Sequence, residues 1–532
     1  MRRSIITIIL SMLFTQLFGN EGIPNPLLFL KKVYFPVIET PACFTSTIRD
    51  KDYLVFIEHS DSLHVTGHYM ALKEAATDTL PFKLEAKGRN AILYYEGEKE
   101  VFRPRIKSMD SQHAEGYARL SLFGTARFSF NIFIAPIFHD FENKRYQDPL
   151  FTVEEIDDIP YANVMGFWSE LADETAVSDK IFSMGNAIYE SSLDLHLDIF
   201  RPKGDSLQKR PLVMLIHGGA FYFGSKDDKS ITQWCRHLAS MGYVAASIDY
   251  RIGFLPTKSS IGRAGYRAIQ DAHAAMRFLV SHQEEFGIDT TMLLVGGASA
   301  GAITALNLAF MTNQTRPEYS HSSFLSPELG DIDTYGNAIK SNFHIKGIVD
   351  MWGAMPDTAL IHDRNIPILA FHGDADDIVP YDYNYPFAIA GILKTMLVEK
   401  MYGSSCIIDR AIKLGYKAQL VTFSGYKHSP HVDPATKELN ENFFTIQDIM
   451  SVFFYNIIVP QPPEIIEENN YYYVRPYPLA TSWQVEGGVI LESKGNNVKV
   501  AWINNAPQHS ITASTLLPRG LGINTKKTVN QP

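Results

Sequence analysis

The sequence predicts an α/β fold whose central sheet is mainly parallel and covered by helices on both faces, with β-rich regions before and after it. Between residues 195 and 459, apolar runs almost free of polar residues alternate with helical stretches, as strands buried on both faces require. On both sides of that segment, short β-branched and aromatic runs are separated by Gly, Asp and Ser. With 45% hydrophobic and 20% charged residues, the composition excludes a wholly disordered chain.

The first 19 residues are predicted to be a secretory signal peptide. Arg2 and Arg3 precede the mostly apolar run Ile5–Phe18, and the small Gly19 provides a cleavage position. No cysteine lies near that position, which argues against a bacterial lipid anchor. No later apolar run approaches the ~20 residues that a membrane helix needs. We therefore predict a secreted, periplasmic or cell-surface protein with no stable membrane span.

Residues 20–150 are predicted to form an N-terminal β-rich domain, and residues 151–190 a connector to the α/β segment. The candidate strands of the first domain are Tyr53–Glu58, Leu63–Met70, Pro81–Ala86, Asn90–Gly97, Val101–Lys107, Tyr117–Gly124 and Ala126–Ile134. The connector contains the acidic run Glu154–Asp158, which we interpret as a solvated loop.

The α/β segment, residues 191–459, is expected to hold the functional residues. Its candidate strands are Leu195–Phe200, Leu212–Ile216, Val244–Ile248, Met292–Gly296, Lys346–Trp352, Ile366–Phe371 and Ala418–Phe423. In open parallel sheets, ligands bind beyond the carboxyl ends of the strands. The residues that follow each strand are therefore the candidates.

A candidate nucleophile follows the strand Met292–Gly296. Residues 297–301 have the form G-x-S-x-G, with Ser299 at the centre, and a predicted helix follows at 302–311. A sharp strand-to-helix turn needs small residues around the serine, because its backbone is strained and closely packed. The helix N-terminus also favours negative charge that develops beside the serine.

Backbone donors for an oxyanion are predicted after the strand Leu212–Ile216. That strand runs into His217-Gly218-Gly219, and consecutive glycines let N–H groups approach a reacting oxygen without an obstructing Cβ. Together with the N–H of Ala300, those of Gly218 and Gly219 would form an oxyanion hole.

A serine nucleophile needs a histidine to take its proton and a carboxylate to orient that histidine. The chain offers an acid and then a histidine, each just past a strand. Residues 372–377, His-Gly-Asp-Ala-Asp-Asp, favour Asp376 as the acid, with Asp377 as the runner-up and Asp374 beside them. His428 is the preferred base. The alternative is His431, with which Asp433 could pair.

These motifs resemble those of the α/β-hydrolases of the carboxylesterase and hormone-sensitive-lipase-like kind. The resemblance covers roughly residues 195–459. It rests on His217-Gly218-Gly219, Asp249-Tyr250-Arg251, the motif around Ser299 and the segment His372–Pro380. It implies the α/β-hydrolase fold, with Ser299 as the nucleophile, Asp376 as the acid and His428 as the base. Ala220 departs from the hormone-sensitive-lipase pattern, in which a third glycine is common.

Other polar residues near these motifs are expected to be structural. This group comprises His217, His362 and His372. Asp249 and Arg251 are expected to form an ion pair beneath the site, and Asp271 to be a helix residue near it.

Residues 460–532 are predicted to form a β-sandwich after the stiff linker at 460–463, Pro-Gln-Pro-Pro. Its candidate strands are Tyr471–Val474, Ser482–Val485, Val489–Glu492 and Asn497–Trp502. The segments 482–488 and 498–502 resemble the immunoglobulin-like, PKD-type repeats of secreted bacterial proteins. That resemblance implies a spacer or adhesion module.

The sequence thus predicts an exported serine carboxylic-ester hydrolase that needs no cofactor and no metal. It contains no metal-binding, phosphate-binding or dinucleotide motif, and a net charge of −10 argues against a nucleic-acid binder. Export and the terminal β-rich regions suit a polymeric or surface-bound substrate. Among esters we favour one with a short acyl chain, on a small molecule or on a polysaccharide. Residues 312–344 or residues 384–416 could form a cap over Ser299.

Two other functions fit the same fold. One is a serine peptidase, although such peptidases usually have an N-terminal propeller larger than the predicted β-rich domain. The other is a catalytically silent adhesion protein, although adhesive relatives usually lack the triad that this sequence retains.

Overall fold

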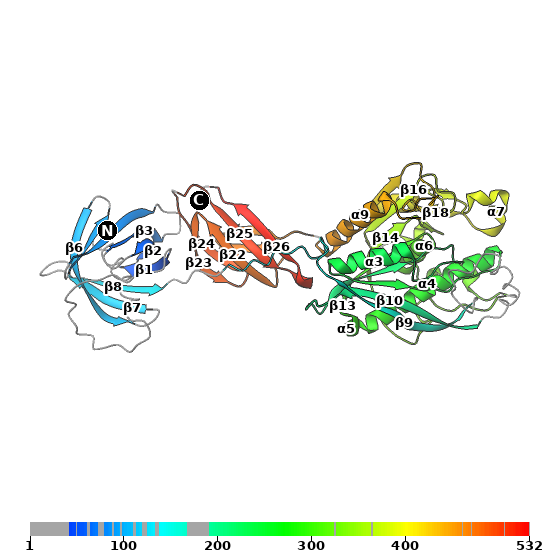
Figure 1. Ribbon diagram of the computed structural model, residues 1–532, viewed down its shortest axis with the longest axis horizontal. Helices are drawn as coiled ribbons and strands as arrows, with labels where there is room; N and C mark the ends of the chain where they lie inside the picture. Colours follow the sequence, from blue (N-terminus) through cyan, green and yellow to red (C-terminus); the bar gives the residue numbers. More distant parts are fainter. Residues whose placement is uncertain are drawn as a thin grey trace. The chain divides into compact units, whose positions relative to one another are not determined.

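The computed structural model describes residues 42–48, 51–60, 64–72, 79–87, 90–95, 98–109, 113–119, 125–132, 138–166, 191–323, 326–362, 365–459, 461–469, 471–504 and 506–530. The predicted signal peptide lies outside the described residues. The chain divides into two compact units (Figure 1): one is Lys144–Gln461, and the other combines Met1–Asn143 with Pro462–Pro532.

The unit Lys144–Gln461 is built on a mixed sheet with the strand order β19-β16-β14-β13-β11-β12-β10-β9. The six strands from β19 to β12 in this order are parallel to one another. Strand β10 runs antiparallel to both of its neighbours, β12 and β9. The strands are β9 (Val153–Gly166), β10 (Ser191–Pro202), β11 (Arg210–Ile216), β12 (Val244–Ile248), β13 (Ile288–Ala298), β14 (Ile345–Met351), β16 (Ile368–Gly373) and β19 (Ala418–Phe423). This is the α/β-hydrolase architecture that the sequence predicts.

Every residue of β11 and β12 is buried, because helices cover the sheet on both faces. Among these helices, α3 packs beside α9, and α4 packs beside α6 (Figure 1). The helices are α3 (Lys229–Met241), α4 (Lys258–Ser281), α5 (Gln283–Phe286), α6 (Ala300–Phe310), α7 (Lys394–Leu397), α8 (Ser404–Lys413) and α9 (Glu441–Ile458). None of the helices in the described part of the chain combines the length and apolarity that crossing a membrane requires.

Local side chains set where the long helices begin. The Asp228 carboxylate accepts the N–H groups of Ser230 and Ile231 at the start of α3, and Gly242 ends that helix in a left-handed conformation. The Thr257 hydroxyl caps α4 and the Asn440 side chain caps α9 in the same way.

The interpretation of the acidic run as a solvated loop is wrong, because Glu154–Asp158 lies in β9 at the edge of the sheet. Strand β9 pairs with β10 along its length. The carboxylates are accommodated because Glu154 pairs with Arg201 at 2.6 Å and Glu155 pairs with Arg236 at 2.8 Å. Charged side chains on an edge strand also discourage pairing with another sheet.

The two long insertions differ in structure. Residues 312–344 contain only the short 3₁₀ turns η1 (Asn313–Thr315) and η2 (Glu318–Ser320) among their described residues. Residues 384–416 contain η4 (Ala388–Leu393), α7, β18 (Met401–Gly403) and α8, so this insertion is largely helical. Strand β18 forms a small sheet with β15 (Ala354–Met355) and β17 (Tyr383–Asn384), and η3 (Thr358–Leu360) follows β15.

The other unit consists of β-structure. Strands β1 to β8 close into a barrel, and seven further described strands form a four-stranded sheet, β20-β21-β24-β23, and a three-stranded sheet, β22-β25-β26. The first group is β1 (Ala42–Ile48), β2 (Lys51–Ser60), β3 (His64–Leu72), β4 (Leu80–Lys87), β5 (Asn90–Tyr95), β6 (Glu98–Met109), β7 (His113–Arg119) and β8 (Thr125–Ile132). The second is β20 (Glu464–Glu468), β21 (Tyr471–Arg475), β22 (Ala480–Glu486), β23 (Gly488–Lys494), β24 (Asn497–Trp502), β25 (Ser510–Leu516) and β26 (Gly522–Thr528), with the 3₁₀ turn η5 (Pro518–Gly520).

The two C-terminal sheets share one apolar core, which makes them a sandwich. Trp483 from one sheet packs with Tyr472 and Trp502 from the other, and the Trp502 indole N–H donates to the Tyr472 hydroxyl at 3.0 Å. Strands β1, β20, β25 and β26 were not anticipated from the sequence, whereas the remaining strands of this unit overlap the predicted ranges.

Candidate active site

Ser299 lies on a sharp turn between β13 and α6. Its backbone has φ 56° and ψ −118°, a left-handed conformation that costs a non-glycine residue energy. A Cβ on Gly297 would collide with the backbone of Gly301, and a Cβ on Gly301 would collide with the carbonyl of Ile216. The two glycines of G-x-S-x-G therefore permit the turn that places the Ser299 side chain at the carboxyl end of the sheet.

The structure brings Ser299, His428 and Asp376 together in one hydrogen-bonded row. His428 Nε2 lies 2.9 Å from Ser299 Oγ, and His428 Nδ1 lies 2.7 Å from Asp376 Oδ2. The Asp376 side chain is fully buried, while that of His428 is 18% exposed. Solvent access at the histidine and burial at the acid are what a proton-transferring pair needs, because the acid then orients the ring without exchanging protons itself.

The Asp376 carboxylate is held by backbone as well as by side chains. Its Oδ1 accepts the N–H groups of Ile378 at 2.8 Å and Val379 at 3.0 Å. Burial by itself would raise the pKa of Asp376, but hydrogen bonds from His372, His428 and Ile378 outweigh it and hold that pKa well below its ordinary value. The acid is therefore ionised at neutral pH.

The neighbouring acids have other partners. Asp377 pairs with Lys427 at 2.8 Å, and Asp374 accepts the Gly425 N–H at 2.6 Å. Neither of these contacts involves His428, so the geometry agrees with the choice of Asp376 over the runner-up.

The contacts of the alternative base His431 lie outside the triad. Its Nε2 lies 2.9 Å from Ser230 Oγ, and its ring stacks on Trp352 with 4.7 Å between centroids. Burial, and then the nearby His428, lower the pKa of His431 to about 3. Asp433 accepts the N–H groups of Ala435 and Thr436 instead of pairing with His431.

Gly218 lies directly beside the nucleophile, because a Cβ added there would be 3.4 Å from Ser299 Cβ. The next three residues all have positive φ: 111° at Gly219, 54° at Ala220 and 59° at Phe221. Gly218 and Ala300, the residue that follows Ser299, are thus close to the serine, and Gly219 follows Gly218 in the tight turn of the loop.

Hydrogen bonds from β12 and the residues after it fix this glycine loop. The Tyr250 hydroxyl donates to the carbonyl of Gly218 at 3.2 Å, and the Gly253 N–H donates to the carbonyl of Phe221 at 2.8 Å. His217 stacks on the Tyr250 ring at 4.2 Å, in agreement with a structural role.

The expected ion pair between Asp249 and Arg251 is wrong. Arg251 pairs with Asp271 at 2.8 Å, and both side chains are almost completely buried. Asp249 instead accepts the Lys226 N–H at 2.8 Å, which fixes the far end of the glycine loop. The two neighbouring residues face different elements, so sequence adjacency gave the wrong partner.

Sequence reasoning did not anticipate two buried polar residues behind the acid. Asp350 on β14 accepts the Ser404 hydroxyl at 2.7 Å, and Ser404 Oγ lies 2.7 Å from His372 Nδ1. The one available signal was the carboxylate of Asp350 inside the otherwise apolar run 347–351.

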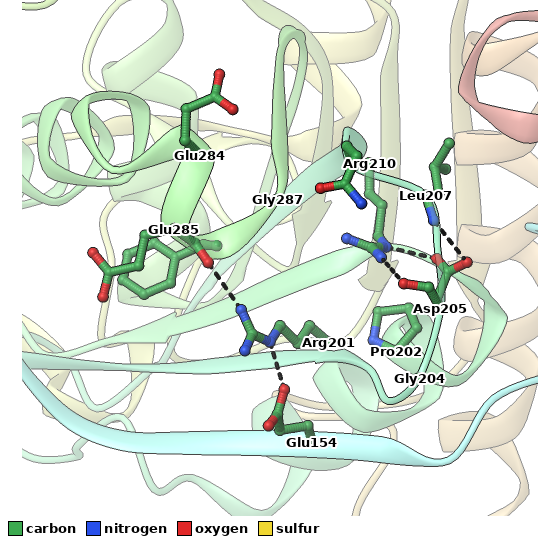
Figure 2. A pocket seen from close by; sticks show the side chains of 12 residues that line it. Glu154, Arg201, Pro202, Gly204, Asp205, Leu207, Arg210, Glu284, Glu285 and Gly287 are labelled. Atoms are coloured by element: carbon green, nitrogen blue, oxygen red, sulfur yellow. Dashed lines mark hydrogen bonds and ion pairs between the residues drawn. The ribbon is translucent and has the colours of Figure 1, made fainter.

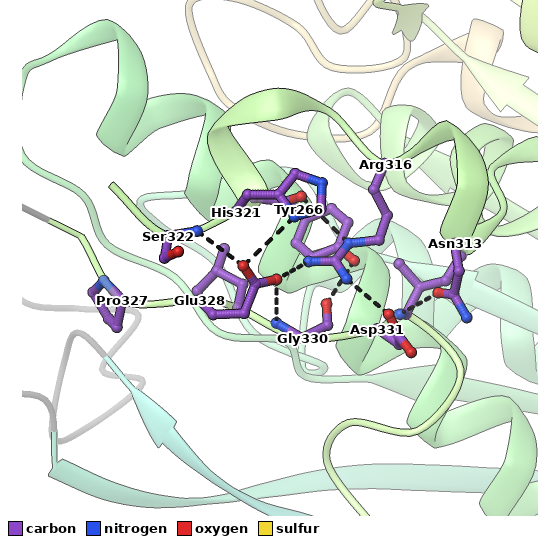
Figure 3. A network of polar contacts seen from close by, with 12 residues as sticks. Tyr266, Asn313, Arg316, His321, Ser322, Pro327, Glu328, Gly330 and Asp331 are labelled. Carbon is purple, nitrogen blue, oxygen red and sulfur yellow. Dashed lines mark hydrogen bonds and ion pairs between the residues drawn. The ribbon is translucent and has the colours of Figure 1, made fainter. Parts of the chain in front are cut away.

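Side chains of α4 tether the insertion at 312–344. Arg263 donates to the carbonyl of Tyr319 at 2.8 Å, and Gln270 donates to that of Leu329 at 2.7 Å. Within the insertion, Arg316 pairs with Glu328 and, at 2.7 Å, with Asp331 (Figure 3). These hydrogen bonds and ion pairs hold the insertion against α4 and stabilise its conformation.

Both insertions reach the first turns of α4. The Tyr319 ring lies against Gly262, and Lys258 pairs with Glu399 of the other insertion at 2.9 Å. The same helix contacts Phe221 of the glycine loop through Gly265. The two insertions therefore meet one end of the helix that borders the glycine loop.

A separate polar hollow lies at the amino ends of β11 and β13 (Figure 2). Ser299 lies at the other end of the strands, after the carboxyl end of β13. The arginines of the hollow are already engaged: Arg201 contacts Glu154 and the carbonyl of Glu285, and Arg210 contacts Asp205. Among the described residues, no cluster of three or more His, Cys, Asp or Glu side chains is arranged to hold a metal ion.

The geometry can be set beside known proteins. Residues 197–360 match the model of the BD-FAE family. The BD-FAE match includes the glycine loop and Ser299 but ends before Asp376 and His428. This part of the chain is similar to the α/β-hydrolases of the esterase kind.

Two curated relatives are esterases. Gut esterase 1 of Caenorhabditis elegans is 32% identical over 134 residues, which cover 25% of this chain and 23% of that protein. The probable isoprenylcysteine alpha-carbonyl methylesterase ICMEL1 of Arabidopsis thaliana is 24% identical over 285 residues, 48% of this chain and 52% of that protein. The chain thus spans about a quarter of the first relative and about half of the second. Together with the family match, they support a carboxylic ester hydrolase.

Two solved structures that are similar to this chain carry the name esterase. A truncated carbohydrate esterase from gut microbiota is 18% identical, with a TM-score of 0.36, and covers 61% of this chain and 99% of its own. An esterase of Thermogutta terrifontis is 19% identical, with a TM-score of 0.35, and covers 50% of this chain and 90% of its own.

Proposed function

We propose that this protein is a secreted serine carboxylic-ester hydrolase that uses Ser299, His428 and Asp376. The observation that supports the proposal most is the unbroken row of contacts from Asp376 through His428 to Ser299, at 2.7 and 2.9 Å. Secretion rests on the layout of residues 1–19.

The reaction follows from this geometry. Ser299 Oγ attacks the ester carbonyl while His428 Nε2 takes the proton of the serine hydroxyl. The carbonyl oxygen becomes negative and accepts hydrogen bonds from the N–H groups of Gly218, Gly219 and Ala300. His428 then gives its proton to the leaving alcohol. A water molecule, activated by the same nitrogen, hydrolyses the acyl-enzyme and regenerates Ser299.

For the substrate we propose a short acyl chain, borne by a small alcohol or by a polysaccharide. Aromatic rings crowd the glycine loop beside Ser299: Tyr222 packs against Phe223 and Phe254, each with 5.0 Å between centroids. The C-terminal sandwich, which we propose to be a PKD-like module, would keep the enzyme close to a polymer. A p-nitrophenyl ester series of graded acyl length, with acetylated xylan as the polymeric substrate, tests this choice.

The chemistry is tested by Ser299→Ala. We expect kcat on p-nitrophenyl acetate to fall by about three orders of magnitude or more, because the nucleophile is lost, while the melting temperature stays near that of the wild type. Near-normal turnover by the folded variant would refute the mechanism. A fluorophosphonate probe gives a second readout, and a wild-type protein that resists labelling would favour the adhesion alternative.

A further inference from the structure

A row of buried polar side chains lies behind the catalytic acid. Asp350 on β14, His372 on β16 and Ser404 at the start of α8 are all fully buried. Ser404 Oγ lies 2.7 Å from Asp350 and 2.7 Å from His372 Nδ1. On the other side of the His372 ring, Nε2 lies 3.2 Å from Asp376 Oδ2 and 3.3 Å from the carbonyl oxygen of Val379. The row therefore joins Asp350 to the triad.

The hydrogen on His372 Nε2 follows from what this nitrogen faces. A carboxylate oxygen and a carbonyl oxygen can only accept, and a lone pair directed at both would be repelled. Nε2 must therefore bear a hydrogen. Histidine tautomers are fixed by the partner of the other ring nitrogen, which here is the Ser404 hydroxyl.

Two proton arrangements of the row satisfy every contact. In one, Asp350 is ionised, Ser404 donates to it, and His372 is an imidazolium that donates from both nitrogens. In the other, Asp350 holds the proton and donates to Ser404, which donates to a neutral His372. They contain the same number of protons, and both direct Nε2–H at Asp376. Burial raises the pKa of Asp350, against the charge on His372 and the hydrogen bonds from Ser404 and Gly353.

We propose that His372 is a positioning residue for the catalytic acid, whose Nε2–H shares Oδ2 of Asp376 with His428. This donor, together with the two backbone donors on Oδ1, fixes the plane of the carboxylate. It also withdraws negative charge from the oxygen that His428 faces, which sets how readily His428 accepts the Ser299 proton. The other groups at His372 are Asp350, Ser404 and the Tyr381 ring, which packs edge-on at 5.5 Å. The inference rests on the proposed function.

The test compares His372→Leu with His372→Gln in the full chain, by the pH dependence of kcat/KM on p-nitrophenyl acetate. His372→Leu removes the donor, so we expect kcat/KM on the plateau to fall about tenfold and the acid limb to move up by about half a pH unit. His372→Gln retains an amide N–H near the position of Nε2. Its acid limb should coincide with that of the wild type, and its kcat/KM should stay within about threefold.

A second variant protects the test against misfolding. Ser404→Ala removes the partner of His372 Nδ1 with little change in volume, and it should move the acid limb in the same direction as His372→Leu. If folded Leu and Ala variants both keep the wild-type acid limb, His372 is only structural and the inference is overturned. A wild-type chain that neither turns over esters nor reacts with a fluorophosphonate would instead refute the proposed function.

Discussion

At the scale of single residues, the candidate site depends on which of three neighbouring carboxylates reaches the histidine. The loop after β16 directs Asp376 inward, where Ile378 and Val379 donate to it, and directs Asp377 outward to Lys427. Two side chains that are adjacent in sequence thus have opposite roles, because the turn rotates one toward the sheet and the other toward solvent.

Asp376→Asn and Asp377→Asn form a matched pair. The first should lower kcat by about a thousandfold or more, because an amide can donate to His428 Nδ1 and so stabilise the wrong tautomer of the ring. The second removes only an exposed contact with Lys427 and should leave kcat within about twofold. Steady-state kinetics on p-nitrophenyl acetate measure both. Similar losses in the two variants would contradict the assignment of the acid.

At the scale of secondary-structure elements, buried charges fasten the glycine loop and α4 to the sheet. Arg251 follows β12 and donates from its N–H and from Nε to Asp271 on α4. A buried carboxylate left without its partner is costly, whereas the intact pair contributes little beyond an apolar pair of the same size. The pair therefore specifies how α4 lies against β12 more than it stabilises the fold.

Replacing Asp271 by Asn should lower the free energy of unfolding by about 3–5 kcal/mol, because Arg251 would keep its charge in a buried site. The double variant Arg251→Met with Asp271→Leu should lose less than the single variant. Urea denaturation measures each value. As a control, Glu284→Gln in the exposed pair with Lys209 should cause no measurable change. A single variant as stable as that control would contradict the burial argument.

Asp249, which fixes the glycine loop, should make stability depend on pH. Burial raises its pKa to about 7, against the N–H of Lys226. Between the unfolded value of ~3.9 and about 7, the folded state binds more protons than the unfolded state, so this group lowers stability as the pH rises. Asn keeps the acceptor oxygen but cannot ionise. We therefore expect Asp249→Asn to gain on the order of 2 kcal/mol over the wild type between pH 5 and pH 8.

Urea denaturation at several pH values measures this difference for Asp249. Two curves that stay parallel from pH 5 to pH 8 would show that the carboxylate does not titrate in that window. Asp433→Asn serves as the control, because Asp433 is only half-buried and belongs to a turn of the chain.

At the scale of the whole molecule, the residues of the proposed reaction all belong to one compact unit, Lys144–Gln461. Its core is continuous from β9 to β19 and includes side chains of α4, α6 and α8. The sandwich has a separate core around Trp483 and Trp502. A unit with its own core can fold by itself, so the proposed chemistry should not need the β-structured unit.

We expect the fragment 144–461 to fold and to hydrolyse p-nitrophenyl acetate within about threefold of the full chain. On acetylated xylan the full chain should be faster than the fragment, because linkage to a binding module raises the effective substrate concentration. The measurement is the rate of the full chain divided by that of the fragment, taken once on p-nitrophenyl acetate and once on acetylated xylan. If this ratio is the same on both substrates, the β-structured unit does not act on the polymer.

The sequence alone predicts the sheet and the order of the site residues, because buried strands are continuous apolar runs and the tight turns need glycine. The strands of the eight-stranded sheet other than β9, and the turn around Ser299, follow from these local requirements. The edge strand β9 could not be found in this way, since its acidic residues are satisfied by arginines of β10 and α3 that are distant in sequence.

Tertiary structure decided the pairings. Three pairings depend on where separate strands and helices bring side chains together. They are the choice between Asp376 and Asp377 as the partner of His428, the choice between Asp249 and Asp271 as the partner of Arg251, and the groups that lie behind the acid. His372 has a local motif, but the partner of its Nδ1 is Ser404 of α8, which in turn binds Asp350 of β14. Contacts between distant segments form only after the chain has packed, and therefore no local pattern encodes them.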